Sequence, residues 1–102
     1  MKRVMMMDEK DNVATALVGI LKGERVEVVS SAQKVLERVV VKDAIPLGHK
    51  IALANMAKGD EVVKYGETIG RGSRDISVGD YVHIHNVESI RLPLTEHVLR
   101  SK

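Results

Sequence analysis

Short aliphatic runs separated by charged and glycine-rich positions make up most of this chain. The first run, residues 3–7 (RVMMM), predicts a buried strand. Residues 11–23 (DNVATALVGILKG) change period, because their apolar positions recur at the spacing of one helical face. Asp11 or Asn12 can cap the start of this segment and Gly23 can end it, so the sequence predicts a helix there. The apolar residues of that face are Val13, Ala14, Leu17, Ile20 and Leu21.

After Gly23 the pattern favours strands. Residues 24–31 alternate between valine and polar side chains, and three consecutive valines at 39–41 are typical of a strand. Pro46 and Gly48 then interrupt the chain. The further β segments, which glycines separate, are residues 49–57, 60–70 and 80–87.

Two of these segments open with the same pattern. Residues 59–62 and 79–82 both read Gly-Asp-x-Val, which predicts a turn at Gly-Asp followed by a strand. In the tail, residues 92–102 predict a last turn of helix after Pro93. A chain of 102 residues fits one compact domain, so we expect residues 1–102 to form a single mainly β (α+β) domain with one helix.

The amino-acid composition limits the kinds of molecule that this protein is expected to bind. The chain has no Phe or Trp and only two tyrosines, Tyr65 and Tyr81, which disfavours a nucleic-acid reader that stacks bases. Sixteen basic residues are interleaved with fourteen acidic ones, so the net charge of +2 forms no basic stripe. The absence of cysteine excludes disulfides, and no apolar run approaches the ~20 residues of a membrane span or forms a signal peptide. We therefore expect a cytoplasmic protein that binds neither nucleic acid nor membrane.

A family resemblance extends over residues 11–89. The runs GHKIAL, KGDEVVKYGETIG and VHIHN stand in the order found in the N-terminal SAF domain of the altronate and galactarate dehydratases, which the chain resembles. The resemblance implies a small β-clip domain with a barrel-like core. It also implies a hydro-lyase that removes water from a hydroxy acid to give a 2-keto-3-deoxy product.

In that family a large catalytic region follows the small module, and some relatives carry the two on separate chains. The resemblance therefore implies a stand-alone small subunit that works with a large catalytic subunit, and it leaves the oligomeric state open. Elimination next to a carboxylate needs a base and an electrophile, for which a divalent ion of iron, manganese or magnesium is expected. The alternatives are the small subunit of a sulfolactate sulfo-lyase, from which sulfite leaves, and a non-catalytic docking module.

His83 and His85 are the first candidate site residues. They alternate with Val82 and Ile84, so in a strand both imidazoles would share one face while Val82 and Ile84 are buried on the other. The pair could bind a metal ion or exchange protons with a substrate, or it could simply face solvent. Because two ligands do not complete a catalytic metal site, we expect only weak metal binding by this chain alone.

Two further clusters of residues are candidates for binding an anionic substrate. His49 follows the Gly48 turn, where it could exchange a proton or join the two other histidines, and Lys50 suits a carboxylate. The loop GRGSRD offers Arg71, Ser73 and Arg74 between glycines that free the backbone for anion approach. Both clusters could equally be solvated turns.

Overall fold

In the computed structural model, which describes residues 1–89, the chain is made of nine strands and no helix. The strands are β1 (Arg3–Met6), β2 (Val13–Ala16), β3 (Arg25–Ser30), β4 (Val35–Val40), β5 (Lys50–Ala52), β6 (Glu61–Lys64), β7 (Glu67–Gly72), β8 (Tyr81–Val82) and β9 (Val87–Ser89). The helical turn expected after Pro93 lies outside the described residues. Within residues 1–89 there is no helix long and apolar enough to cross a membrane.

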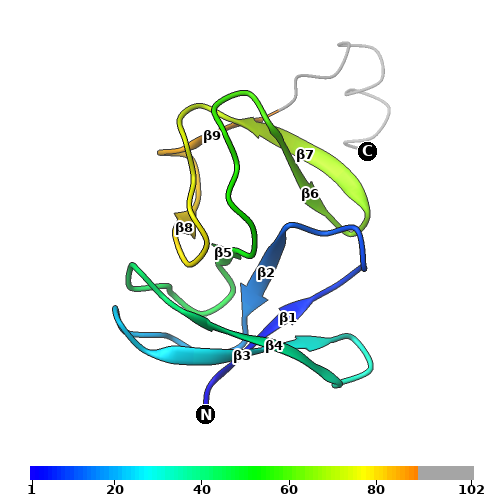
Figure 1. The fold of residues 1–102 in the computed structure, drawn as a ribbon, viewed down its shortest axis with the longest axis vertical. Coiled ribbons are helices and arrows are strands. Elements are labelled where there is room, and N and C mark those ends of the chain that lie inside the picture. The colour runs from blue at the N-terminus through cyan, green and yellow to red at the C-terminus, as the bar shows by residue number, and fades with distance from the viewer. Residues whose placement is uncertain (90–102) are drawn as a thin grey trace, which may run out of the picture.

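The strands form two sheets (Figure 1). Six strands pair in the order β4-β3-β1-β2-β5-β8, and β6, β7 and β9 form a smaller antiparallel sheet. All neighbours are antiparallel except β1 and β3. The larger sheet stays open, with β4 and β8 as its outer strands, so the barrel-like core expected from the resemblance is not closed among residues 1–89.

The core is aliphatic, as a chain without Phe or Trp requires. One cluster fills the larger sheet around Val4, Val28 and Ile51, and a second lies under the small sheet around Met56 and Val62. All five side chains are at most 4% exposed. Because both clusters rely on many small side chains, loss of one methylene is felt by its neighbours.

The prediction of a helix over residues 11–23 is wrong. Val13–Ala16 is β2, which pairs with β1 on one side and β5 on the other, so strand pairing overrides the helical period. Leu17 and Leu21, assigned to the buried helical face, are 44% and 67% exposed. Asp11 does not cap a helix, because its buried carboxylate accepts the N–H groups of three residues in turns: Asp8, Tyr65 and Gly66.

Four turns of the same type recur along the chain. The first of them, at residues 21–24, lies at the end of the segment that was predicted to be a helix. In each, a glycine with φ between 83° and 93° is followed by a residue whose N–H donates to the carbonyl three positions earlier. This is the geometry of a type II turn, which requires a positive φ at its third residue. The turns span residues 21–24, 46–49, 57–60 and 77–80. The two repeats of Gly-Asp-x-Val noted in the sequence are therefore half of a fourfold set.

Each turn is also fixed to a neighbouring segment by the same pair of backbone bonds. The glycine N–H donates to a carbonyl, and the N–H of that same neighbouring residue donates back to the residue after the glycine. The turns associate in pairs through the residues that precede them, since Ile20 bridges Ile45 and Met56 bridges Ile76. The four neighbouring residues are Val41, Ala16, Gly72 and Ala52.

Gly79 and Gly59 provide a matched test of this architecture. Both have φ near 92°, but a Cβ on Gly79 would overlap the Val40 carbonyl oxygen, whereas a Cβ on Gly59 would meet nothing within 4 Å. We expect Gly59→Ala to lower the free energy of unfolding by about 1–2 kcal/mol, the cost of a left-handed L-residue. Gly79→Ala should cost at least about 1 kcal/mol more. Urea denaturation of both variants checks this, and equal losses would contradict it.

Candidate functional site

His49 occupies a position that is structural in the other three turns. There the residue after the glycine is acidic, and its carboxylate accepts the N–H of the first turn residue. The pairs are Asp60 with Ala57 (2.8 Å), Asp80 with Ser77 (2.7 Å) and Glu24 with Leu21 (2.6 Å). In the turn at residues 46–49 Pro46 has no N–H to satisfy, and His49 stands where the acid would be. The His49 side chain is therefore free of the turn.

The freed imidazole joins a group of four rings. The His49 Nδ1 atom lies 2.7 Å from the Tyr81 hydroxyl oxygen, and its ring centroid is 5.0 Å from that of His83. Tyr81 stacks on His83 with an interplanar angle of 7° at 5.5 Å, and its centroid is 5.4 Å from His85. We call these residues, His49, Tyr81, His83 and His85, the His–Tyr cluster.

Tyr81 is the member that the sequence interpretation missed. It lies two positions before His83, the same spacing that drew attention to His85. It also directly follows the turn at residues 77–80, as Lys50 directly follows the turn at residues 46–49, and Tyr81 pairs with Ile51 on the adjacent strand. Aligning the four turns against one another would have shown that Tyr81 and Lys50 occupy equivalent positions, each directly after a turn.

The expectation of one strand through residues 80–87 is wrong. β8 ends at Val82, residues 83–86 form a turn, and β9 begins at Val87. Val82 is fully buried, as predicted, but Ile84 is 82% exposed.

Asn86 is the cause of the turn. Its side-chain oxygen accepts the His83 N–H at 2.9 Å, and its amide donates to the Tyr81 carbonyl at 2.8 Å. Such side-chain bonds to the local backbone compete with a continued strand. Because Asn86 is 4% exposed, it fixes the backbone between Tyr81 and His83 from inside the protein.

A cationic cavity adjoins the cluster. It has a volume of about 170 Å³ and is lined by Lys50, Ile69, His83, Ile84, Val87 and Ser89. Partial burial lowers the pKa of the Lys50 ammonium, and the nearby Lys64 lowers it further. Partial burial also lowers the pKa of His83 from its ordinary 6.5, with added repulsion from His49, Lys50 and His85. A site in which positive groups repel one another favours an anionic ligand.

Three other predicted site residues make different contacts. Arg71 Nη2 lies 3.9 Å from Glu61 Oε2 on the small sheet, and both side chains are more than half exposed. The Ser73 N–H donates to the Asn86 carbonyl at 2.9 Å, so this residue supports the turn that carries His83 and His85. Arg74 is exposed. The structure thus gathers His49, Lys50, His83 and His85 in one place, pairs Arg71 with Glu61 on the small sheet, and gives Ser73 a backbone contact with the turn beside the cluster.

The described residues 1–89 do not by themselves assemble a full set of ligands for the expected divalent metal. This part of the chain contains no group of three or more His, Cys, Asp or Glu side chains placed to bind one ion. One nitrogen of His49 is already engaged by Tyr81. An ion of iron, manganese or magnesium would need ligands from outside the described residues.

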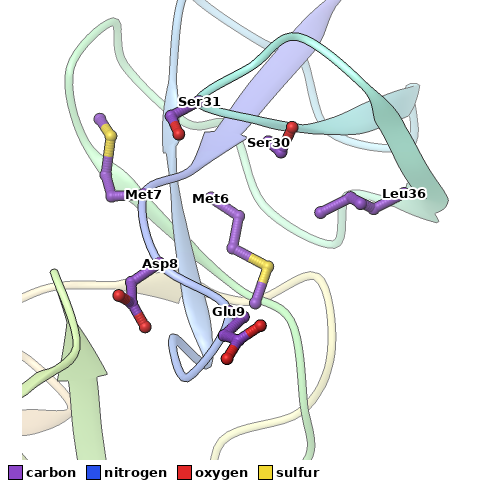
Figure 2. Close-up of a pocket in the computed structure, with 7 residues that line it drawn as sticks. All are labelled: Met6, Met7, Asp8, Glu9, Ser30, Ser31 and Leu36. Atoms are coloured by element: carbon purple, nitrogen blue, oxygen red, sulfur yellow. The ribbon is translucent and has the colours of Figure 1, made fainter.

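A second cavity lies far along the sheet from the cluster. Its volume is about 250 Å³, and Figure 2 shows Leu36 extending toward Met6, whose side chain runs toward Glu9. Leu36 belongs to β4, at the opposite edge of the six-stranded sheet from β8. Its lining residues are Met6, Met7, Asp8, Glu9, Ser30, Ser31 and Leu36.

Comparison with known proteins identifies the family. The sequence model of the altronate/galactarate dehydratase SAF domain matches residues 2–90. The chain belongs to this family. It is 42% identical over 89 residues to altronate dehydratase of Bacillus subtilis (strain 168), a match covering 87% of this chain and 17% of that protein.

Two further relatives are small chains. The (2R)-sulfolactate sulfo-lyase subunit alpha of Chromohalobacter salexigens is 49% identical over 51 residues, covering 50% of this chain and 54% of that one. The subunit of the same name in Paracoccus pantotrophus is 46% identical over 54 residues, covering 53% and 81%. This SAF domain thus spans only about a sixth of the length of the dehydratase but most of the Paracoccus subunit.

The comparison of turns predicts opposite roles for Asp60 and His49 in stability. Asp60→Ala leaves the Ala57 N–H without its acceptor, so the free energy of unfolding should fall by about 1 kcal/mol. His49→Ala should cost about 0.5 kcal/mol or less, because no turn N–H depends on it. Denaturant titration of the two variants measures both values. A larger loss for His49→Ala would show that this imidazole is structural.

The lowered pKa of His83 predicts a dependence of stability on pH. Below pH 6.5 the unfolded chain takes up a proton at this residue, while the folded chain does not until its lower pKa is reached. The free energy of unfolding should therefore fall as pH drops below 6.5, and His83→Gln should reduce that fall. Urea titrations at pH 7.5 and 5.5 test this. An identical pH dependence in wild type and variant would contradict it.

Proposed function

We propose that this chain is the small subunit of a hydro-lyase of the altronate/galactarate type, acting with a large catalytic subunit on a separate chain. The observation that carries the proposal is the His–Tyr cluster beside the Lys50 cavity. It combines proton-transfer groups with a cationic surface, as dehydration of a hydroxy acid requires.

The proposed roles follow from charge and position. Lys50 binds the substrate carboxylate by a charge-assisted hydrogen bond. His83, kept neutral by its lowered pKa, takes the proton from the carbon next to that carboxylate. His49 gives a proton to the departing hydroxide, and the enol product then becomes the 2-keto-3-deoxy acid. Solvent returns the proton from His83 to His49, and the exposed His85 adds positive charge at the rim.

A partner completes this site in the proposal. A divalent ion that stabilises the enolate would need a set of ligands that residues 1–89 do not assemble, so the partner would supply them. The exposed surface also favours a partner here: Ile84, at the tip of the turn between the two histidines, is 82% exposed, and Leu47, in the His49 turn, is 66% exposed. In two of the equivalent turns the residue matching Leu47 is a lysine. Apolar side chains beside a cationic site suit burial against a second protein surface.

Sulfolactate sulfo-lyase is the second candidate, favoured by the identity to the two alpha subunits. The same proton abstraction by His83 would then expel sulfite, which as an anion needs no proton from His49. Retained activity of His49→Ala toward sulfolactate, with loss toward sugar acids, would favour this candidate.

Reconstitution with the large dehydratase chain of the same genome tests the partnership. We expect no turnover of altronate, galactarate or sulfolactate by the small chain alone, and turnover of one of these acids by the mixture. His83→Ala should lower kcat by roughly 100-fold or more in the mixture, the usual contribution of a general base. Full activity of either chain alone, or of the His83→Ala mixture, would refute the proposal.

The matched variants Ile84→Asp and Leu36→Asp locate the partner surface. Each places a carboxylate at an exposed apolar position, one beside the cluster and one at the opposite sheet edge. Titration calorimetry should show at least tenfold weaker association for Ile84→Asp and unchanged association for Leu36→Asp. Equal affinities would place the partner elsewhere on the chain.

A further inference from the structure

Tyr81 contacts every imidazole of the cluster, yet it is not one of the residues assigned a proton-transfer role above. Its ring lies 5.4 to 5.6 Å from the rings of His49, His83 and His85. Its hydroxyl is the atom that bonds His49 Nδ1, at 2.7 Å, a short distance for such a pair. One side chain therefore packs against three imidazoles and binds one of them by a polar group.

The Tyr81 backbone is fixed on both sides. Its N–H donates to Asp43 Oδ2 at 3.0 Å, and its carbonyl accepts the Asn86 amide at 2.8 Å. β8 pairs with β5, the strand that follows the His49 turn, through Ile51 and Tyr81. The hydroxyl is thus held against His49 by contacts that do not involve His49 itself, which is what a preorganised support requires.

The direction of the bond follows from acidity. A phenol O–H is a stronger acid than a neutral imidazole N–H, and an imidazole nitrogen is a stronger base than a phenol oxygen. The stronger arrangement therefore has Tyr81 donating to Nδ1. A His49 ring bound in this way carries its own proton on Nε2.

We infer that Tyr81 is the positioning residue of His49: its hydroxyl fixes the tautomer with the proton on Nε2 and presents that N–H to the bound acid. The Nε2 proton is the one that His49 gives to the departing hydroxide. The Tyr81 hydroxyl proton moves to Nδ1 as it leaves, so no imidazolate forms, and it returns to Tyr81 when solvent reprotonates Nε2. Only this last role depends on the proposed hydro-lyase function, because the tautomer belongs to the chain itself.

Tyr81→Phe and Tyr65→Phe form a matched pair of variants, since these are the two tyrosines of the chain. Tyr81→Phe keeps the stacked ring and removes only the hydroxyl. Tyr65 is 62% exposed, and its ring lies 5.2 Å from the Lys64 ammonium. Long-range proton–nitrogen spectra of the ¹⁵N-labelled chain at pH 7.5 report which nitrogen of His49 carries the proton.

We expect wild type and Tyr65→Phe to show His49 with the proton on Nε2, and Tyr81→Phe to show a mixture of both tautomers. In the reconstituted complex Tyr81→Phe should lower kcat about tenfold, the size of one hydrogen bond, with KM changed less than twofold. A proton on Nδ1 in wild type, or an unchanged tautomer in Tyr81→Phe, would overturn the inference. Inactivity of the wild-type complex toward all three acids would instead refute the proposed function, and the spectra would still decide the tautomer.

Discussion

The left-handed glycine at the third position of four type II turns is the constraint on which the rest of this domain depends. Each such glycine reverses the chain, and its N–H reaches a carbonyl on a neighbouring segment. At Gly79 the neighbouring backbone is so close that no side chain fits. Without these turns the short strands could not meet, because pairs of two or three residues such as β5 and β8 contribute little by themselves.

The candidate site is made from departures from that repeated design. One turn exchanges its acidic capping residue for His49 and its first N–H for Pro46. Another is followed by Tyr81 and then by a tight turn that Asn86 holds from within. The remainder of the repeats keep the backbone rigid, so two local changes are enough to bring imidazoles from distant parts of the sequence within 5.0 Å of each other. Rigid elements that carry a few irregular positions are a common basis for functional sites.

Much of this arrangement can be predicted from the sequence. Alternating valines indicate β3, the family resemblance indicates a small β domain, and the Gly48 turn indicates that His49 can approach His83. The helix over residues 11–23 was wrong because Leu17 and Leu21 follow a helical period by accident, while long-range pairing with β1 and β5 decides the backbone. Gly23 added to the error, since a helix C-cap and a type II turn both require a positive φ.

The strand through Ile84 failed for a related reason, because alternation does not reveal a side chain such as Asn86 that bonds to its own backbone. A local pattern therefore cannot distinguish a continued strand from a turn held by one buried amide. Tyr81 escaped notice because a tyrosine gains its chemistry from the partner of its hydroxyl, and that partner is 32 residues away.

Pro46 has a consequence for how the domain could be altered. A turn whose first residue lacks an N–H makes no demand on the side chain that closes it, so its fourth position becomes interchangeable in a way that Glu24, Asp60 and Asp80 are not. The four turns thus share one backbone shape, but only the turn at residues 46–49 accepts different side chains at its fourth position without loss of a hydrogen bond. Ser77→Pro would remove the N–H that Asp80 accepts. Position 80, next to Tyr81, could then carry functional groups that this protein does not have.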